Sequence, residues 1–136
     1  MTIVVDASVA VKWVLHEIGS DAADALLDHD GLIAPSIWRA EVMNALLRRA
    51  RMAEITAKEA SERLSELENA PVASVPFEPH LDRALKLATE IRHPISDCLY
   101  LALAVHHDTH VVTADRRFVT AASAADLADR VRLLSP

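Results

Sequence analysis

Short runs of apolar, β-branched residues alternate along the chain with longer segments whose apolar residues recur every three or four positions. The first run covers residues 3–5 and ends at Asp6, and such a run is typical of a strand buried on both faces of a sheet. A second run, stopped by Pro35, gives another short strand. In all, we predict strands at residues 3–5, 32–34, within 71–77, at 110–113 and at 131–134.

The segments between these strands have the periodicity of helices. We predict helices over residues 7–15, 20–30, 36–51, 56–69, 79–91 and 96–107, and a short helical stretch after a polar turn at 114–117. Ser20 and Ser96 are predicted N-caps, and Thr56 and Glu59 have the spacing of a capping box. The alternation predicts an α/β fold with three layers, in which helices flank a central parallel sheet of about five strands.

Length and composition indicate one compact domain over residues 1–136, half of it apolar. The single cysteine, Cys98, cannot form an internal disulfide, so nothing points to an oxidising compartment. The apolar segment 2–15 has no basic leader and is interrupted by Asp6 and Lys12, unlike a signal peptide. No stretch reaches the roughly 20 apolar residues of a membrane span. We therefore expect a cytoplasmic protein without membrane association.

The formal net charge of −6 argues against a domain that binds nucleic acid through bulk positive charge. It does not exclude an enzyme acting on nucleic acid. Carboxylates that hold divalent ions contribute to such a charge, and the bound ions offset it locally.

Four carboxylates lie at positions of the predicted fold where a functional site could form. Asp6 and Asp115 follow strands, and sites in open α/β sheets form at the carboxyl ends of the strands. Asp97 opens an apolar helix, and Glu41 lies inside another, where a carboxylate is costly to bury unless it is paired or binds a cation. Each acid taken alone has a structural explanation. Asp6 could cap a helix, and Asp97 could interact with a helix dipole. Asp115 could be a turn residue, and Glu41 could face solvent.

The four acids lie in segments that occur in a characteristic order. The segments are residues 5–8 (VDAS), 41–46 (EVMNAL), 96–104 (SDCLYLALA) and 113–118 (TADRRF). Together they resemble the PIN-domain ribonucleases, and most closely the VapC toxins of bacterial type II toxin–antitoxin pairs. The resemblance extends over essentially the whole chain in length, motif order and spacing.

The resemblance implies a PIN-like fold and an acidic pocket for Mg²⁺ or Mn²⁺, formed by Asp6, Glu41, Asp97 and Asp115. Asp6 and Asp97 match the direct ligands. Ser8, Asn44 and Thr113 match supporting positions that orient carboxylates or bound water. The implied reaction is endonucleolytic cleavage of RNA that leaves a 5′-phosphate.

The ligand type is consistent with that chemistry. Oxygen ligands without a thiolate cluster suit Mg²⁺ or Mn²⁺ rather than zinc. One ion would activate the attacking water, a second would stabilise the departing ribose oxygen, and Glu41 or Asp115 could accept the proton. The predicted contacts to RNA phosphates are Lys12, Arg116 and Arg117, with Arg39 and Arg48 as further candidates.

The resemblance also implies partners. They are an RNA substrate, a cognate VapB-type antitoxin that reaches the acidic groove, and a second copy in a homodimer. The apolar helices over 38–47 and 56–67 are candidate surfaces for these contacts, or equally part of the core.

Other functions stay open at this point. One is a housekeeping PIN-domain nuclease without an antitoxin, and another is a PIN-like scaffold that only binds partners. From a different class, a receiver-like phosphoacceptor domain has similar size and fold. It requires adjacent acids after the first strand and a lysine after the last, whereas here Ala7 follows Asp6 and residues 131–136 hold no lysine.

Several conspicuous side chains are assigned to packing. Cys98 begins an apolar helix without an evident base, and Trp13 and Trp38 suit a core or an interface. His106 and His110 are four residues apart, beside His107, but no fourth zinc ligand is evident.

Overall fold

The computed structural model describes residues 1–135, and its centre is a five-stranded sheet in which every neighbouring pair is parallel. The strands are β1 (Ile3–Val5), β2 (Leu32–Pro35), β3 (Ala73–Val75), β4 (Val111–Thr113) and β5 (Val131–Leu133). Their order across the sheet is β3-β2-β1-β4-β5. The predicted α/β class with a central parallel sheet is confirmed.

The strand order places a topological switch point at the middle of the sheet. From β1 the chain moves outward through β2 and β3, then crosses back to β4 on the other side of β1. Val4 therefore pairs with Ile33 on one side and with Val111 on the other. In open α/β sheets the crevice at the carboxyl ends of such strands is the usual ligand site.

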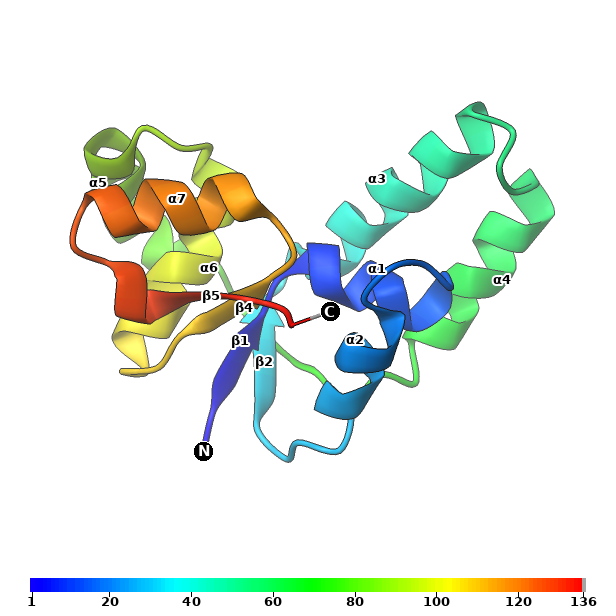
Figure 1. Cartoon of the computed structure of the whole chain (residues 1–136), viewed down its shortest axis with the longest axis horizontal. Helices are drawn as coiled ribbons and strands as arrows, with labels where there is room; N and C mark the ends of the chain where they lie inside the picture. Colours follow the sequence, from blue (N-terminus) through cyan, green and yellow to red (C-terminus); the bar gives the residue numbers. More distant parts are fainter. Residues whose placement is uncertain (136) are drawn as a thin grey trace.

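Two groups of helices flank the sheet (Figure 1). α5, α6 and α7 gather on one side, and α1 to α4 lie on the other, with α3 and α4 forming a hairpin that projects outward (Figure 1). The helices are α1 (Ala7–Val14), α2 (Ser20–Leu26), α3 (Trp38–Arg51), α4 (Ala57–Leu67), α5 (Leu81–Ile91), α6 (Ile95–His106) and α7 (Arg116–Ala124), with short 3-10 helices η1 (Glu78–His80) and η2 (Ala128–Arg130).

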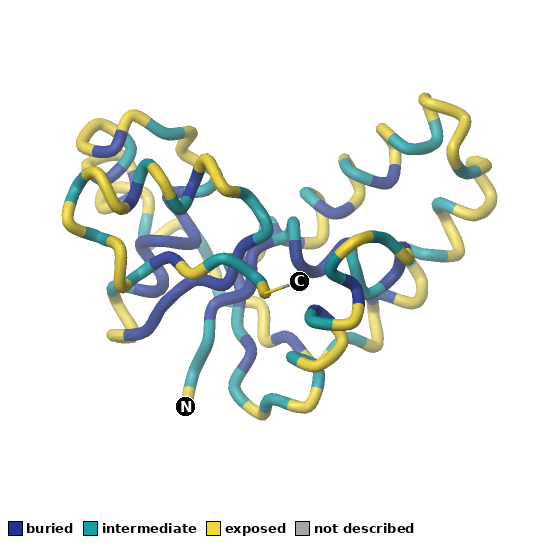
Figure 2. Tube along the Cα trace, in the orientation of Figure 1, coloured by how far each residue is buried: buried dark blue, intermediate teal, exposed yellow. Residues whose placement is uncertain are grey.

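The core is built around α6, which packs on β1, β2 and β4. Seven consecutive residues of this helix, 98–104, are buried, because sheet and helices enclose it on nearly all sides. Trp38 and Phe118 are also fully buried, and the Trp38 indole N–H donates to Ser74 Oγ at 2.8 Å. Figure 2 shows this concentration of buried chain in the sheet and the adjoining helices, whereas the tip of the α3–α4 hairpin is exposed. A rigid α6 fixes the position of Asp97 in its first turn.

Two predicted N-caps are wrong. Ser20 lies inside α2, whose N-cap is Gly19 at φ 91°, and its hydroxyl instead accepts from the Glu17 amide and donates to the Leu15 carbonyl. Ser96 lies inside α6, which is capped at Pro94. α2 thus begins at Ser20 itself and α6 begins one residue before Ser96, because local turn contacts compete with capping.

Several boundaries also differ from the prediction. Pro35 ends β2 instead of following it, α2 stops at Leu26, and α3 begins only at Trp38. The segment predicted as a polar turn at 114–117 already contains the start of α7, because the Asp115 side chain caps that helix. The capping box of Thr56 and Glu59 is confirmed, with both reciprocal hydrogen bonds present. Within residues 1–135, no helix is long and apolar enough to cross a bilayer.

Candidate active site

Asp6 lies at the carboxyl end of β1 and is almost entirely buried, with 5 % of its surface exposed. Its Oδ2 accepts hydrogen bonds from the Ser8 hydroxyl at 2.5 Å and the Thr113 hydroxyl at 2.9 Å. Although Asp6 occupies the N-cap position of α1, its side chain makes no capping hydrogen bond. Burial raises its pKa to about 6, because the ionised carboxylate has lost water without gaining a cationic partner. Asp6 is therefore more than a helix cap.

The two hydroxyl residues tie the ends of β1 and β4 together. Besides contacting Asp6, Ser8 Oγ accepts from the amide of Ala114 at 3.0 Å. Thr113 Oγ1 accepts from the amide of Asp115 at 3.1 Å. These hydrogen bonds hold the loop that carries Asp115 beside Asp6. Ser8 and Thr113 thus both donate to Asp6, and the supporting role that the resemblance implies for them stays a prediction.

Asp97 projects from the first turn of α6 and is half-buried. Its Oδ2 is 2.7 Å from Nε2 of His93, in the turn between α5 and α6. Burial raises the pKa of Asp97, and the negative charge of Asp115 adds to the shift.

Asp115 has a structural contact as well as a place in the site. Its Oδ1 accepts from the Arg117 amide at 2.9 Å, which caps α7. One carboxylate oxygen also lies within 4.8 Å of ligand atoms of His93 and Asp97. The turn between β4 and α7 therefore brings this carboxylate to the Asp97 side of the site.

Glu41 is in the first turn of α3 and faces inward, so the solvent-facing alternative does not apply. Its Oε1 accepts from the Tyr100 hydroxyl at 2.5 Å. Burial raises the pKa of Glu41 to about 7, and the negative charges of Asp6 and Asp97 act in the same direction. Asn44, one turn further along α3, is exposed.

The four acids come from four separate segments and influence one another electrostatically. Asp97 raises the pKa of Asp6, and both raise that of Glu41, while Asp115 acts on Asp97. Such mutual effects require that the carboxylates lie close together. Among the described residues, none of the four forms an ion pair with lysine or arginine.

This arrangement fits a divalent cation. The carboxylates are clustered, partly desolvated and short of positive charge, and oxygen donors are the ligands that Mg²⁺ and Mn²⁺ accept. A bound cation would favour their ionised forms and lower the raised pKa values.

Two side chains of the site were not identified from the sequence. Tyr100 is three residues after Asp97 and thus on the same face of α6, a spacing that could have signalled it. His93 is four residues before Asp97, but a turn lies between them, so helical spacing gives no guide.

The predicted phosphate contacts differ in their surroundings. Arg116 and Arg117 are exposed at the start of α7, beside Asp115. Lys12 lies in α1 and contacts the loop that follows the helix. Its ammonium lies 3.1 Å from Glu17 Oε1 and donates to the Ile18 carbonyl at 2.6 Å. Arg39 lies over the Trp38 ring, 5.0 Å from its centroid.

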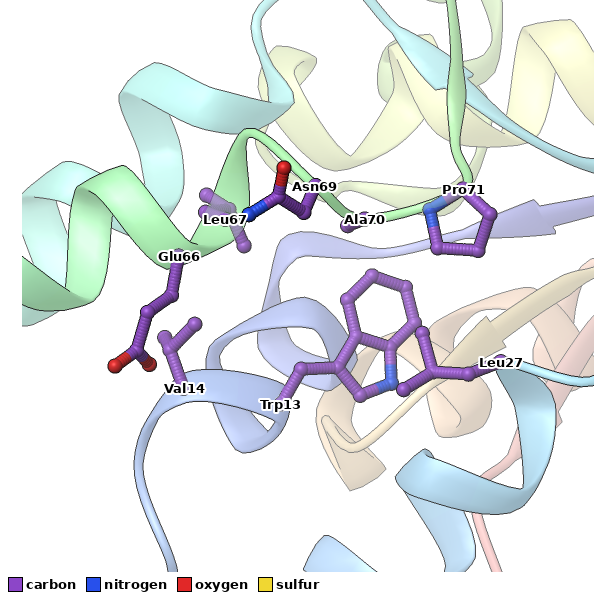
Figure 3. Close-up of a pocket in the computed structure, with 8 residues that line it drawn as sticks. All are labelled: Trp13, Val14, Leu27, Glu66, Leu67, Asn69, Ala70 and Pro71. Carbon is purple, nitrogen blue, oxygen red and sulfur yellow. The ribbon is translucent and has the colours of Figure 1, made fainter.

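A pocket lies at the end of α1, near Trp13 (Figure 3). Figure 3 shows the Trp13 ring between Leu27 and the segment after α4 that carries Pro71. This pocket of about 350 Å³ is mainly apolar and holds one carboxylate, that of Glu66. The Trp13 indole N–H donates to the Ala23 carbonyl at 2.7 Å, which anchors the ring in the fold.

Cys98 is not a nucleophile. Its side chain is fully buried, and burial raises the pKa of its thiol to about 11. The thiolate form required for attack is therefore scarce at neutral pH.

The fold and the site define a class: α/β proteins with a cluster of acidic side chains at the carboxyl edge of a parallel sheet. The PIN domain family matches residues 3–124, and the chain belongs to that family. Its members are generally divalent-metal-dependent nucleases, and membership implies a metal-dependent nuclease here.

The fold is similar to the crystal structure of PAE2754 from Pyrobaculum aerophilum, with a TM-score of 0.69 and 24 % sequence identity over 89 % of this chain and 79 % of that one. At this level of sequence identity, the similarity between the two structures shows a shared fold and nothing further. No match was found among curated proteins.

Proposed function

We propose that this PIN domain is an Mg²⁺- or Mn²⁺-dependent endoribonuclease and the VapC-type toxin of a type II toxin–antitoxin pair. The observation that carries the nuclease part is the convergence of Asp6, Glu41, Asp97 and Asp115 at the switch point of the sheet, where none of them pairs with a lysine or arginine of residues 1–135. The order and spacing of the four motifs support the toxin subtype.

In the proposed reaction Asp6 and Asp97 are the principal ligands, and Asp115 and Glu41 complete the acidic set. A bound divalent cation would supply Lewis acidity that makes water nucleophilic towards phosphorus. Glu41 is a candidate to accept the proton of that water, because it lies close to Asp6 and Asp97 and the bound cation would keep its carboxylate ionised. The exposed Arg116 and Arg117 are candidates for holding the phosphates of the substrate.

The proposed partners are an antitoxin and a second copy of the chain. The α3–α4 hairpin exposes Met43 and Leu47 beside a groove of about 270 Å³ lined by both helices. An exposed apolar surface of this kind suits a protein contact. The alternative of a nuclease without an antitoxin uses the same site but requires no such partner.

Expression of the chain alone in bacteria tests this proposal. We expect growth to stop, and the purified protein to cut RNA with Mg²⁺ or Mn²⁺ but not with excess EDTA. RNA cleavage combined with normal growth would favour the nuclease without an antitoxin. Absence of metal-dependent cleavage across transfer, ribosomal and messenger RNA would contradict the nuclease itself.

Tyr100→Phe should slow RNA cleavage by about tenfold, since removing an outer hydrogen bond to a metal-site carboxylate typically costs 10–100-fold. The change deletes only the hydroxyl that donates to Glu41 and keeps the buried ring. Single-turnover cleavage rates measure the effect. Ser123→Ala, which removes an exposed hydroxyl that donates to the Val119 carbonyl within α7, is the matched control and should keep the wild-type rate. Equal rates for Tyr100→Phe and wild type would show that the hydroxyl does not position Glu41 for the reaction.

A further inference from the structure

His93 presents a nitrogen atom to the acidic site from a fixed position. Its side chain is nine-tenths buried, with 10 % exposed, and its ring stacks on Phe118 at 5.1 Å between centroids and 9° between planes. The backbone is also defined: Arg92 ends α5 in the left-handed region at φ 54°, and the His93 amide donates to the Ala88 carbonyl. Stacking and backbone together leave the ring little freedom to turn away.

The nitrogen that faces the site is Nε2. It lies 2.7 Å from Asp97 Oδ2, and ligand atoms of His93, Asp97 and Asp115 all lie within 4.8 Å of one another. Among the described residues, these three side chains form a group that could hold a metal ion, and one of the three is an imidazole. Asp6 and Glu41 lie near this group, since the negative charge of Asp97 adds to the burial that raises the pKa of each of them.

We propose that His93 is a direct nitrogen ligand of the metal centre, which makes the centre prefer Mn²⁺ over Mg²⁺. The proposal rests on the proposed function only in taking the same cation site. On binding, the neutral ring would offer the Nε2 lone pair to the cation and keep its proton on Nδ1, so the hydrogen bond to Asp97 is replaced by coordination of both groups.

The preference follows from the chemistry of the donors. Mg²⁺ takes oxygen ligands and parts reluctantly with its water, so an imidazole adds little to its binding. Transition-metal ions accept imidazole nitrogen readily, and affinity at a nitrogen-containing site rises from Mn²⁺ onward through the first-row series. A fixed imidazole among carboxylates therefore favours Mn²⁺ relative to a site built from oxygen alone.

Pulsed electron paramagnetic resonance of the Mn²⁺-loaded protein tests the ligand directly. We expect ¹⁴N modulation from a coordinated imidazole, replaced by a ¹⁵N pattern when the histidines are ¹⁵N-labelled. His93→Gln should abolish the signal and lower the ratio of Mn²⁺ to Mg²⁺ affinity, measured by titration calorimetry, by about tenfold or more. His106→Gln, at the exposed end of α6, is the matched control and should keep both.

The outcomes separate this inference from its alternatives. Absence of nitrogen coupling in the wild-type protein would overturn it, with no variant needed. If His93→Gln weakened both cations equally while the wild type showed no nitrogen signal, His93 would only position Asp97, and the inference would be wrong. Nitrogen coupling in a protein that does not cut RNA would sustain this inference while the proposed nuclease function fails.

Discussion

Asp97→Asn is expected to lower the rate of metal-dependent RNA cleavage by about a thousandfold while the chain stays folded. Asparagine keeps the shape of the side chain but removes the negative charge that would hold the cation at the start of α6. Metal ions contribute several kcal/mol of charge stabilisation to such reactions, and each 1.36 kcal/mol corresponds to a factor of ten in rate. A thousandfold loss therefore corresponds to about 4 kcal/mol of that contribution.

Single-turnover cleavage at saturating Mg²⁺ or Mn²⁺ measures this effect, and circular dichroism checks the fold. Asp129→Asn removes the same charge from an exposed position in η2 and should leave the rate unchanged. A wild-type rate for Asp97→Asn would refute the assignment of the site. A loss shared by both variants would point to net charge instead of the metal centre.

The metal-free protein should lose stability as the pH rises from about 4 to about 7. The folded-state pKa values of Asp6, about 6, and of Glu41, about 7, lie above their ordinary values of 3.8 and 4.5. The folded chain therefore retains protons that the unfolded chain has released, so the free energy of unfolding falls across this range and levels off above pH 7. For buried Asp6 alone, the raised pKa corresponds to a loss of about 3 kcal/mol in the free energy of unfolding, and Glu41 acts in the same direction.

Urea unfolding in EDTA at several pH values gives the profile. Burial lowers the pKa values of His80 and His110, so these groups make the free energy of unfolding rise with pH near pH 6. The informative quantity is therefore the difference in free energy of unfolding between wild type and Asp6→Asn. That variant should be the more stable protein at pH 8 without metal, and Mg²⁺ should stabilise the wild type much more than the variant. Asp21→Asn, at an exposed position in α2, is the matched control. If Asp6→Asn were less stable than wild type at pH 8 in EDTA, the buried carboxylate would not be the source of the effect.

Much of the fold was predictable because its signals are local. The β-branched runs at Ile3–Val5 and Val111–Thr113 mark central strands, since only a buried parallel strand is apolar on both faces. The Thr56–Glu59 capping box needs only its own turn of chain. Helix ends at Ser20 and Ser96 were mispredicted, because several nearby positions can cap equally well and the surrounding turn decides among them.

The sequence by itself determined the alternation of strands and helices, and it placed Asp6 and Asp115 just beyond two strand ends. Only the tertiary structure decided that β1 lies between β2 and β4, which brings those two strand ends together. It also turned Glu41 inward to Tyr100, 59 residues away, and His93 onto Phe118. Hydrophobic periodicity records which face of an element is buried, but not which distant element covers it. The partners of Glu41 and His93 therefore became evident only when the layers were packed.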